Sequence, residues 1–157
     1  MTYWALNGAM TMYKHILIPT DGSDLSRKAI QHGIALAKSE GAKVSGITVT
    51  VPFHVFATDP ETLTDTPVSY RKRVAAIAAR YLGQIEDAAA TAGVSCDVVN
   101  LEHEQPYQAI VDTAKKNGCD LIVMASHGRR GVSALVLGSE TVKVLTHSTI
   151  PILVYRQ

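Results

Sequence analysis

The chain has 157 residues, of which 46% are hydrophobic and 18% charged, and its 15 basic side chains nearly balance 14 acidic ones. This length suits one domain with one core, and the composition excludes a disordered chain. The small net charge does not favour nucleic acid as a partner. No stretch approaches the roughly 20 apolar residues of a membrane-spanning helix, and the N-terminus lacks signal-peptide features, so we expect no membrane partner.

The two cysteines, Cys96 and Cys119, lack C-x-x-C spacing and are too few for a disulfide framework. A reducing compartment is the simpler interpretation, so the sequence predicts a cytoplasmic protein. Residues 1–12 show neither periodicity nor turn chemistry, whereas a strong strand signal follows them. We interpret residues 1–12 as an N-terminal extension and residues 13–157 as the domain.

Strand and helix signals alternate along the domain. A short run rich in β-branched residues at 15–19 predicts a strand, and the turn residues Thr20-Asp21-Gly22-Ser23 lead from it into a helix over 24–40. A second strand is expected at 43–51, followed by a long loop over 52–67. The remaining expected elements are a helix at 68–92, a strand at 96–101, a helix from 106 to 117, a strand at 121–124, a helix capped by Ser139 that reaches 147, and a strand at 150–155.

Five strands that alternate with helices predict a parallel sheet wound on both faces, because parallel neighbours need crossover connections. In such α/β sheets the ligand lies beyond the carboxyl ends of the strands, where the direction of winding reverses. The loops after the first and fourth strands, Pro19–Ser23 and Ala125–Gly131, are therefore the candidate ligand-binding loops.

Residue types in the second loop suit a phosphate. Gly128 and Gly131 allow the main chain to approach a ligand closely, and Gly138-Ser139-Glu140-Thr141 places N–H groups at a helix N-terminus. The helix dipole and the hydroxyls of Ser139 and Thr141 would add to the attraction.

Ala125-Ser126-His127-Gly128, nine residues and then Gly138-Ser139 resembles the G-x-x-G-x9-G-[ST] loop of the universal stress protein family. The likeness spans residues 13–156 and includes Ile16–Ser23 and Pro151–Val154. It implies the strand order 3-2-1-4-5, a homodimer paired through the last strand, Ile150 to Tyr155, and, in the nucleotide-binding branch, bound ATP or AMP, with Mg²⁺ accompanying ATP.

Carried over by position, the resemblance places Thr20 and Asp21 at the ribose, Val49 at the adenine ring, and Met124 with Ala125 at the sugar and base edge. Phosphate would be held by Gly128, Gly138, Ser139 and Thr141. The complete set of expected nucleotide-binding residues is Pro19, Thr20, Asp21, Val49, Met124, Ala125, His127, Gly128, Arg129, Gly138, Ser139, Glu140 and Thr141.

Ala125 departs from the pattern, because it stands where the motif has its first glycine. A left-handed backbone would cost an alanine about 1 to 2 kcal/mol. An extended backbone would leave only one methyl group near the ligand. We expect binding to survive, with a preference for fewer phosphates.

Several roles stay open at this point. Asp21 is also a good helix-capping residue, Arg129 and Arg130 either clamp phosphate or are solvated, and His127 is more typical of a loop histidine than of a catalyst. The scattered histidines show no zinc spacing, and no catalytic residues are predicted.

Three functions compete: a regulatory module that binds ATP or AMP with little or no turnover, a slow ATPase or autokinase, and a nucleotide-free dimer that serves as a partner platform. Separately, the last strand would be an exposed apolar edge in a monomer, which favours pairing with a second copy.

Overall fold

The structure is a computed structural model that describes residues 11–53, 66–128 and 136–156. Its described residues form a five-stranded parallel sheet in the order β3-β2-β1-β4-β5, which confirms the expected fold. The strands are β1 (His15–Pro19), β2 (Lys43–Thr50), β3 (Cys96–Glu102), β4 (Leu121–Ala125) and β5 (Ile152–Tyr155). The helices are α1 (Asp24–Glu40), α2 (Pro67–Ala92), α3 (Pro106–Lys116) and α4 (Ser139–His147). The expected loop over 52–67 and extension over 1–12 lie largely outside the described residues.

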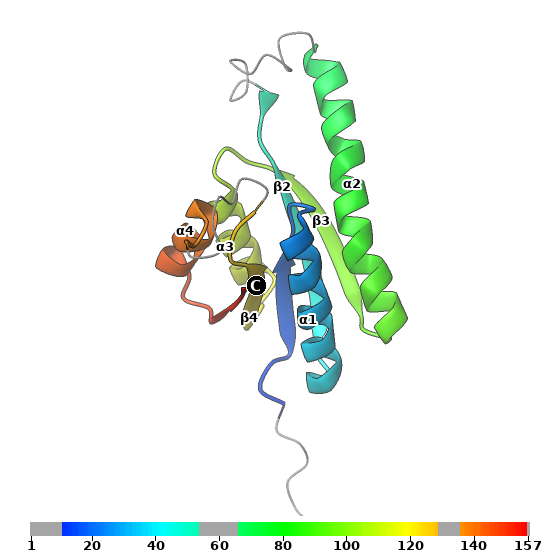
Figure 1. The fold of residues 1–157 in the computed structure, drawn as a ribbon, viewed down its shortest axis with the longest axis vertical. Coiled ribbons are helices and arrows are strands. Elements are labelled where there is room, and N and C mark those ends of the chain that lie inside the picture. The colour runs from blue at the N-terminus through cyan, green and yellow to red at the C-terminus, as the bar shows by residue number, and fades with distance from the viewer. Residues whose placement is uncertain (1–10, 54–65, 129–135, 157) are drawn as a thin grey trace, which may run out of the picture.

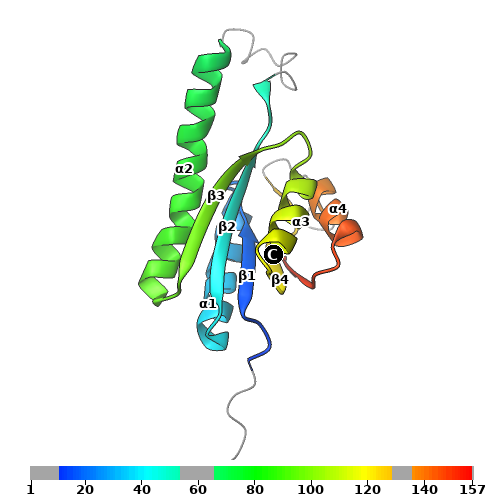
Figure 2. The ribbon, with the colours of Figure 1, turned by 180° about the vertical axis from the view of Figure 1, so that it is seen from behind.

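Helices cover both faces of the sheet (Figures 1 and 2). On one face, α1 and α2 pack on alternate strand residues such as Ile16, Ile18 and Val123. On the other face, α3 and α4 pack on the intervening residues, among them Leu17 and Ile122. Each residue of β1 and β4 is buried, as expected of central strands covered on both sides.

Local chemistry sets most of the element ends. The side chain of Ser23 caps α1 by accepting a hydrogen bond from the N–H of Ser26, and Gly41 ends this helix in the left-handed conformation. A capping box between Thr66 and Ser69 begins α2 at Pro67, one residue earlier than predicted.

The predicted starts of α4 and β5 are wrong. Ser139 does not cap α4, because Gly138 occupies the cap position and makes no side-chain bond, which leaves Ser139 as the first helical residue. The last strand begins at Ile152 rather than Ile150, because the Ser148 hydroxyl accepts from the N–H of Ile150 and holds that segment in a turn.

The winding reverses between β1 and β4. From β1 the chain proceeds through β2 to β3 on one side, and then crosses back to β4 and β5 on the other. The carboxyl ends of β1 and β4 therefore lie side by side at the switch point, where the loops that follow them meet. None of the helices in the described part of the chain is both long enough and apolar enough for a membrane span.

A polar network lies at the opposite, amino end of the sheet. His15 is 5% exposed, and its ring bonds through Nε2 to the Ser45 hydroxyl (2.8 Å) and through Nδ1 to the carbonyl of Asn117 (3.1 Å). Ser45 in turn donates to Asp97 (2.6 Å). Burial, followed by the nearby charge of Lys43, lowers the pKa of His15, although Asn117 and the nearby carboxylates oppose this shift.

Candidate functional site

A cavity of about 470 Å³ lies beyond the carboxyl ends of the central strands, and both candidate loops contribute to it. It is lined by Pro19, Thr20, Asp21, Ser26, Ile47, Val49, Pro106, Ile110, Met124, Ala125, His127, Gly128, Gly138, Ser139, Glu140 and Thr141. Every predicted site residue that the structure describes is in this lining. Arg129 and Gly131 lie outside the described residues.

Sequence reasoning missed four lining residues: Ser26, Ile47, Pro106 and Ile110. One of them, Ile47, had a readable signal. Ile47 precedes Val49 by two residues on one strand, so both side chains point to the same face. Pro106 and Ile110 are four apart and share one face of α3, but only the fold shows that this face borders the site.

Asp21 organises the loop after β1. Its Oδ1 accepts hydrogen bonds from the N–H of Ser23 (3.0 Å) and the hydroxyl of Ser26 (2.7 Å). The carbonyl of the preceding residue, Thr20, accepts from the hydroxyl of Thr48 (2.8 Å). Asp21 therefore stabilises the start of α1 while its carboxylate borders the cavity, and the two roles left open by the sequence are compatible.

Glycines allow the two loops to come together. A Cβ added to Gly128 would collide with Oδ2 of Asp21, and one added to Gly138 would lie 3.0 Å from Cα of His127. The N–H of Gly138 donates to the carbonyl of Ser126 (2.7 Å). The start of α4 is thus fixed directly against the end of β4.

Ala125 has an extended backbone at the end of β4, paired with Tyr155 of β5. Within the described residues, positive φ angles occur only at glycines, so the left-handed cost considered for Ala125 does not arise. Its methyl group packs with Leu25 and Ala29 of α1. Compared with the glycine of the motif, Ala125 therefore adds only one methyl group at the cavity wall.

The N-terminus of α4 faces the cavity and presents main-chain N–H groups. The first N–H groups of any helix have no acceptor within the helix, and the cap residue Gly138 has no side chain to bond them. The Thr141 hydroxyl donates to the carbonyl of Ala125 (3.1 Å), and Thr141 is 3% exposed. Its hydroxyl proton therefore ties α4 to β4, and the main chain with Ser139 is left to provide donors for an anion.

Glu140 points toward α3. Its Oε2 accepts from the N–H of Tyr107 (2.9 Å), and its Oε1 accepts from Nζ of Lys143 (2.9 Å). The hydrogen bond from Lys143 and the charge of Glu140 raise the pKa of Lys143.

The groups with basic or nucleophilic chemistry either make hydrogen bonds within the site or lie away from it. Nδ1 of His127 lies 3.1 Å from the Ser126 hydroxyl, which is on a residue only 2% exposed. The free thiols of Cys96 and Cys119 lie outside the cavity lining, and burial raises the pKa of each to about 11. The arrangement suits binding of an anionic ligand more than attack on it.

The sequence model of the universal stress protein family matches residues 12–156. The chain belongs to the universal stress protein family. Universal stress protein MJ0531 of Methanocaldococcus jannaschii is 30% identical over 166 residues, which cover 100% of this chain and 92% of that protein. Universal stress protein YxiE of Bacillus subtilis is 31% identical over 149 residues, which cover 92% of this chain and 100% of that protein.

Solved universal stress proteins share the fold. The structure of protein MJ0577 of Methanocaldococcus jannaschii has a TM-score of 0.77 at 25% identity, covering 93% of this chain and 97% of that one. A universal stress protein solved in complex with cAMP has a TM-score of 0.65 at 23% identity, covering 92% and 97%. The universal stress protein of Archaeoglobus fulgidus solved with dAMP has a TM-score of 0.60 at 17% identity, covering 92% and 98%.

Proposed function

We propose that this universal stress protein is a regulatory module that binds an adenine nucleotide, ATP or AMP, in the switch-point cavity with little or no turnover. The observation that carries the proposal is the convergence of Asp21, Gly128 and the uncapped N-terminus of α4 on one cavity. The complexes of other family members with cAMP and dAMP support an adenine nucleotide as the class of ligand.

The cavity offers chemistry for each part of such a ligand. Ile47, Val49 and Ile110 supply apolar surface for the base, and Met124 with Ala125 borders the sugar and base edge. Thr20 and Asp21 supply oxygen atoms for ribose hydroxyls, with Pro19 beside them. Phosphate would be held by the main chain at Gly128, Gly138 and Ser139, with Arg129 and, for ATP, a bound Mg²⁺ adding positive charge.

The side chains near the cavity that could act as a general base already make hydrogen bonds, which supports slow or absent turnover. Asp21 Oδ1 accepts two hydrogen bonds within its own loop, and Nδ1 of His127 lies against the buried Ser126 hydroxyl. A general base needs a free site within hydrogen-bond reach of the attacking group. We accordingly place the slow ATPase and autokinase functions second.

Isothermal titration of the purified chain with ATP, ADP and AMP tests the proposal. Binding of at least one nucleotide at micromolar to millimolar concentration is the expected result, and no heat of binding at millimolar nucleotide would overturn it and favour the nucleotide-free platform. Incubation with labelled ATP separates binding from turnover, with Asp21→Ala as the comparison. Turnover by the parent chain that Asp21→Ala abolishes would favour the ATPase instead.

A homodimer through β5 is part of the proposed function. Leu153 on β5 is 40% exposed, and Val142 and Leu145 on the neighbouring α4 are 45% and 41% exposed. β5 is the last strand of the sheet, so in a monomer its outer edge would expose unpaired main-chain groups beside apolar side chains, which proteins avoid. Sedimentation at micromolar concentration should show a dimer that Leu153→Glu dissociates, and a monomer in the parent chain would contradict the proposal.

We also propose a cytoplasmic location for this protein. Cys96 and Cys119 are free thiols, as expected of a protein from a reducing compartment. Fractionation of the source cells, followed by detection of the protein with an antibody, tests this location.

A further inference from the structure

The N-terminus of α3 lacks a side-chain cap from its own segment. Gln105 occupies the cap position and makes no side-chain hydrogen bond to the helix, and Pro106 is the first helical residue. The N–H of Tyr107 is one of the groups that a helix start leaves without an internal acceptor. Glu140 supplies that acceptor from the first turn of α4, 33 residues further along the chain.

This hydrogen bond joins two walls of the cavity. Pro106 and Ile110 of α3 form one part of the lining, and Gly138 and Ser139 at the start of α4 form another. Glu140 also belongs to the lining, and its Oε2 accepts the hydrogen bond from α3. The side chain of Glu140 therefore links the apolar wall to the start of α4, where phosphate would bind.

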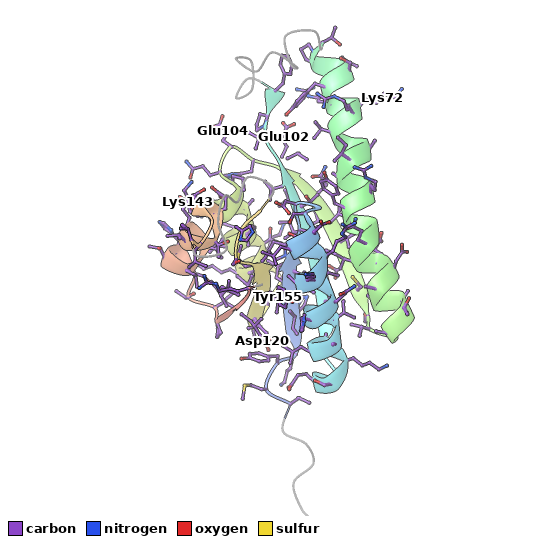
Figure 3. All side chains as sticks on the ribbon, in the orientation of Figure 1. Lys72, Glu102, Glu104, Asp120, Lys143 and Tyr155 are labelled. Atoms are coloured by element: carbon purple, nitrogen blue, oxygen red, sulfur yellow. The ribbon has the colours of Figure 1, made fainter. Side chains whose placement is uncertain are left out.

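Neighbouring side chains hold this carboxylate in place. Nζ of Lys143 donates to Oε1 and lies 5.5 Å from the ring centroid of Tyr107. The rings of Tyr107 and His147 pack 4.8 Å apart, so both ends of α4 contact the start of α3. Figure 3 shows Lys143 on α4, on the side of the molecule away from α1 and α2.

The charge of Glu140 bears on the ligand. A carboxylate in the first turn of a helix is attracted by the helix dipole, as a phosphate would be. Glu140 therefore places a negative charge at the same helix N-terminus that would attract the ligand's phosphates, and this charge repels them. The nearby Lys143 ammonium offsets this charge only partly, because it lies in solvent-exposed surroundings where ion pairs are weak.

We propose that Glu140 is a positioning and specificity-determining residue of the nucleotide site, which joins α3 to the start of α4 and favours nucleotides with fewer phosphates. This inference rests on the proposed nucleotide binding. The two roles have different effects on affinity. The hydrogen bond from Tyr107 affects the affinity for every ligand that contacts the apolar wall, whereas the charge lowers affinity more as the number of phosphates increases.

Two substitutions separate the hydrogen bond from the charge. Glu140→Gln keeps an acceptor oxygen for the N–H of Tyr107 and removes the charge, whereas Glu140→Ala removes both. Titration of each variant with adenosine, AMP and ATP should show that Glu140→Gln raises the ratio of ATP to adenosine affinity about three- to tenfold, as expected for removal of one nearby charge near a protein surface. Glu140→Ala should weaken adenosine binding about tenfold, because the α3 wall loses its hydrogen bond to the start of α4.

Two further variants control the comparison. Lys143→Met removes the neighbouring cation and should lower the ratio of ATP to adenosine affinity, the opposite of Glu140→Gln. Glu86→Gln removes an exposed carboxylate on α2, far from the cavity lining, and should leave all affinities at the parent values. An unchanged ratio in Glu140→Gln would overturn the specificity role, and parent-like adenosine affinity in Glu140→Ala would overturn the positioning role.

Amide hydrogen exchange without nucleotide gives an independent readout. The Tyr107 amide should exchange about tenfold or more faster in Glu140→Ala than in the parent chain, and Glu140→Gln should restore slow exchange. Equal exchange in all three proteins would overturn the link between α3 and α4. A parent chain that protects this amide but binds none of the three ligands would overturn the proposed function while leaving the link in place.

Discussion

Replacement of Gly128 by alanine tests how closely the two site loops depend on each other. The added Cβ would come closer to Oδ2 of Asp21 than the 3.0 Å that real Cβ atoms keep from other atoms, and it would lie 3.3 Å from Cγ. The Asp21 carboxylate cannot move away freely, because Oδ1 is held by Ser23 and Ser26. Either these hydrogen bonds or the end of β4 must give way.

The size of the effect follows from those hydrogen bonds. Loss of a hydrogen bond to a charged group costs about 1.5 to 3 kcal/mol, which corresponds to roughly a ten- to hundredfold loss of nucleotide affinity if the loops separate. A similar loss of folding free energy in a chain of this size lowers the melting temperature by about 3 to 12 °C. Titration calorimetry with AMP and thermal unfolding followed by circular dichroism measure the two quantities.

Matched variants make the result decisive. Gly83→Ala lies within α2, where an added Cβ meets nothing within 4 Å, so it should leave affinity unchanged and raise stability by up to about 1 kcal/mol. In an Asp21→Ala background, Gly128→Ala should cost much less stability, because the colliding carboxylate is gone. Parent-like affinity and melting temperature in Gly128→Ala would refute the argument for loop contact.

Three further predictions concern single positions. Ala125→Gly should not raise AMP affinity in calorimetry, because the backbone of Ala125 is already extended, and a tenfold gain in affinity would contradict this. The same substitution should lower the free energy of unfolding by about 1 to 2 kcal/mol, because a buried methyl group is lost and the unfolded chain gains entropy. The lowered pKa of His15 means that the unfolded chain binds a proton more readily than the folded chain does. Urea denaturation should therefore show full stability above about pH 6.5 and a loss of stability as the pH falls below it. The dependence of stability on pH should be weaker in His15→Gln, and an equal dependence in both proteins would assign the loss to other groups. Gly22→Ala should destabilise more than Gly41→Ala, since both glycines have positive φ but only Gly22 would place a Cβ against the Tyr81 ring; equal losses in chemical denaturation would mean that the ring moves aside without cost.

The sheet could be predicted because each strand carries its own signal. The apolar runs at His15–Pro19 and Leu121–Ala125 are short, bounded by turn residues and buried on both faces, which is what parallel central strands require. Their order depended on family resemblance, because a strand sequence does not state which strands will be its neighbours. The two site loops followed from the fold rule that places ligands at the switch point.

Other features of the site depend on contacts between distant segments. Pro106 and Ile110 line the cavity because α3 packs over the sheet beside β4, and nothing within their own sequence indicates a ligand. The bond from Glu140 to Tyr107 spans two helices and has no local signature. Ser139 looked like a cap by residue type, but the bond from Gly138 to Ser126 makes Gly138 the last non-helical residue.

That same bond from the N–H of Gly138 to the carbonyl of Ser126 has a use in protein engineering. It fixes both ends of the intervening segment, and the entropy of closing a loop rises only slowly with its length. A reporter peptide inserted within residues 129–135 would therefore leave the junction of β4 and α4 in place. Such an insertion would add a second function to this domain without interrupting any helix or strand that the structure describes.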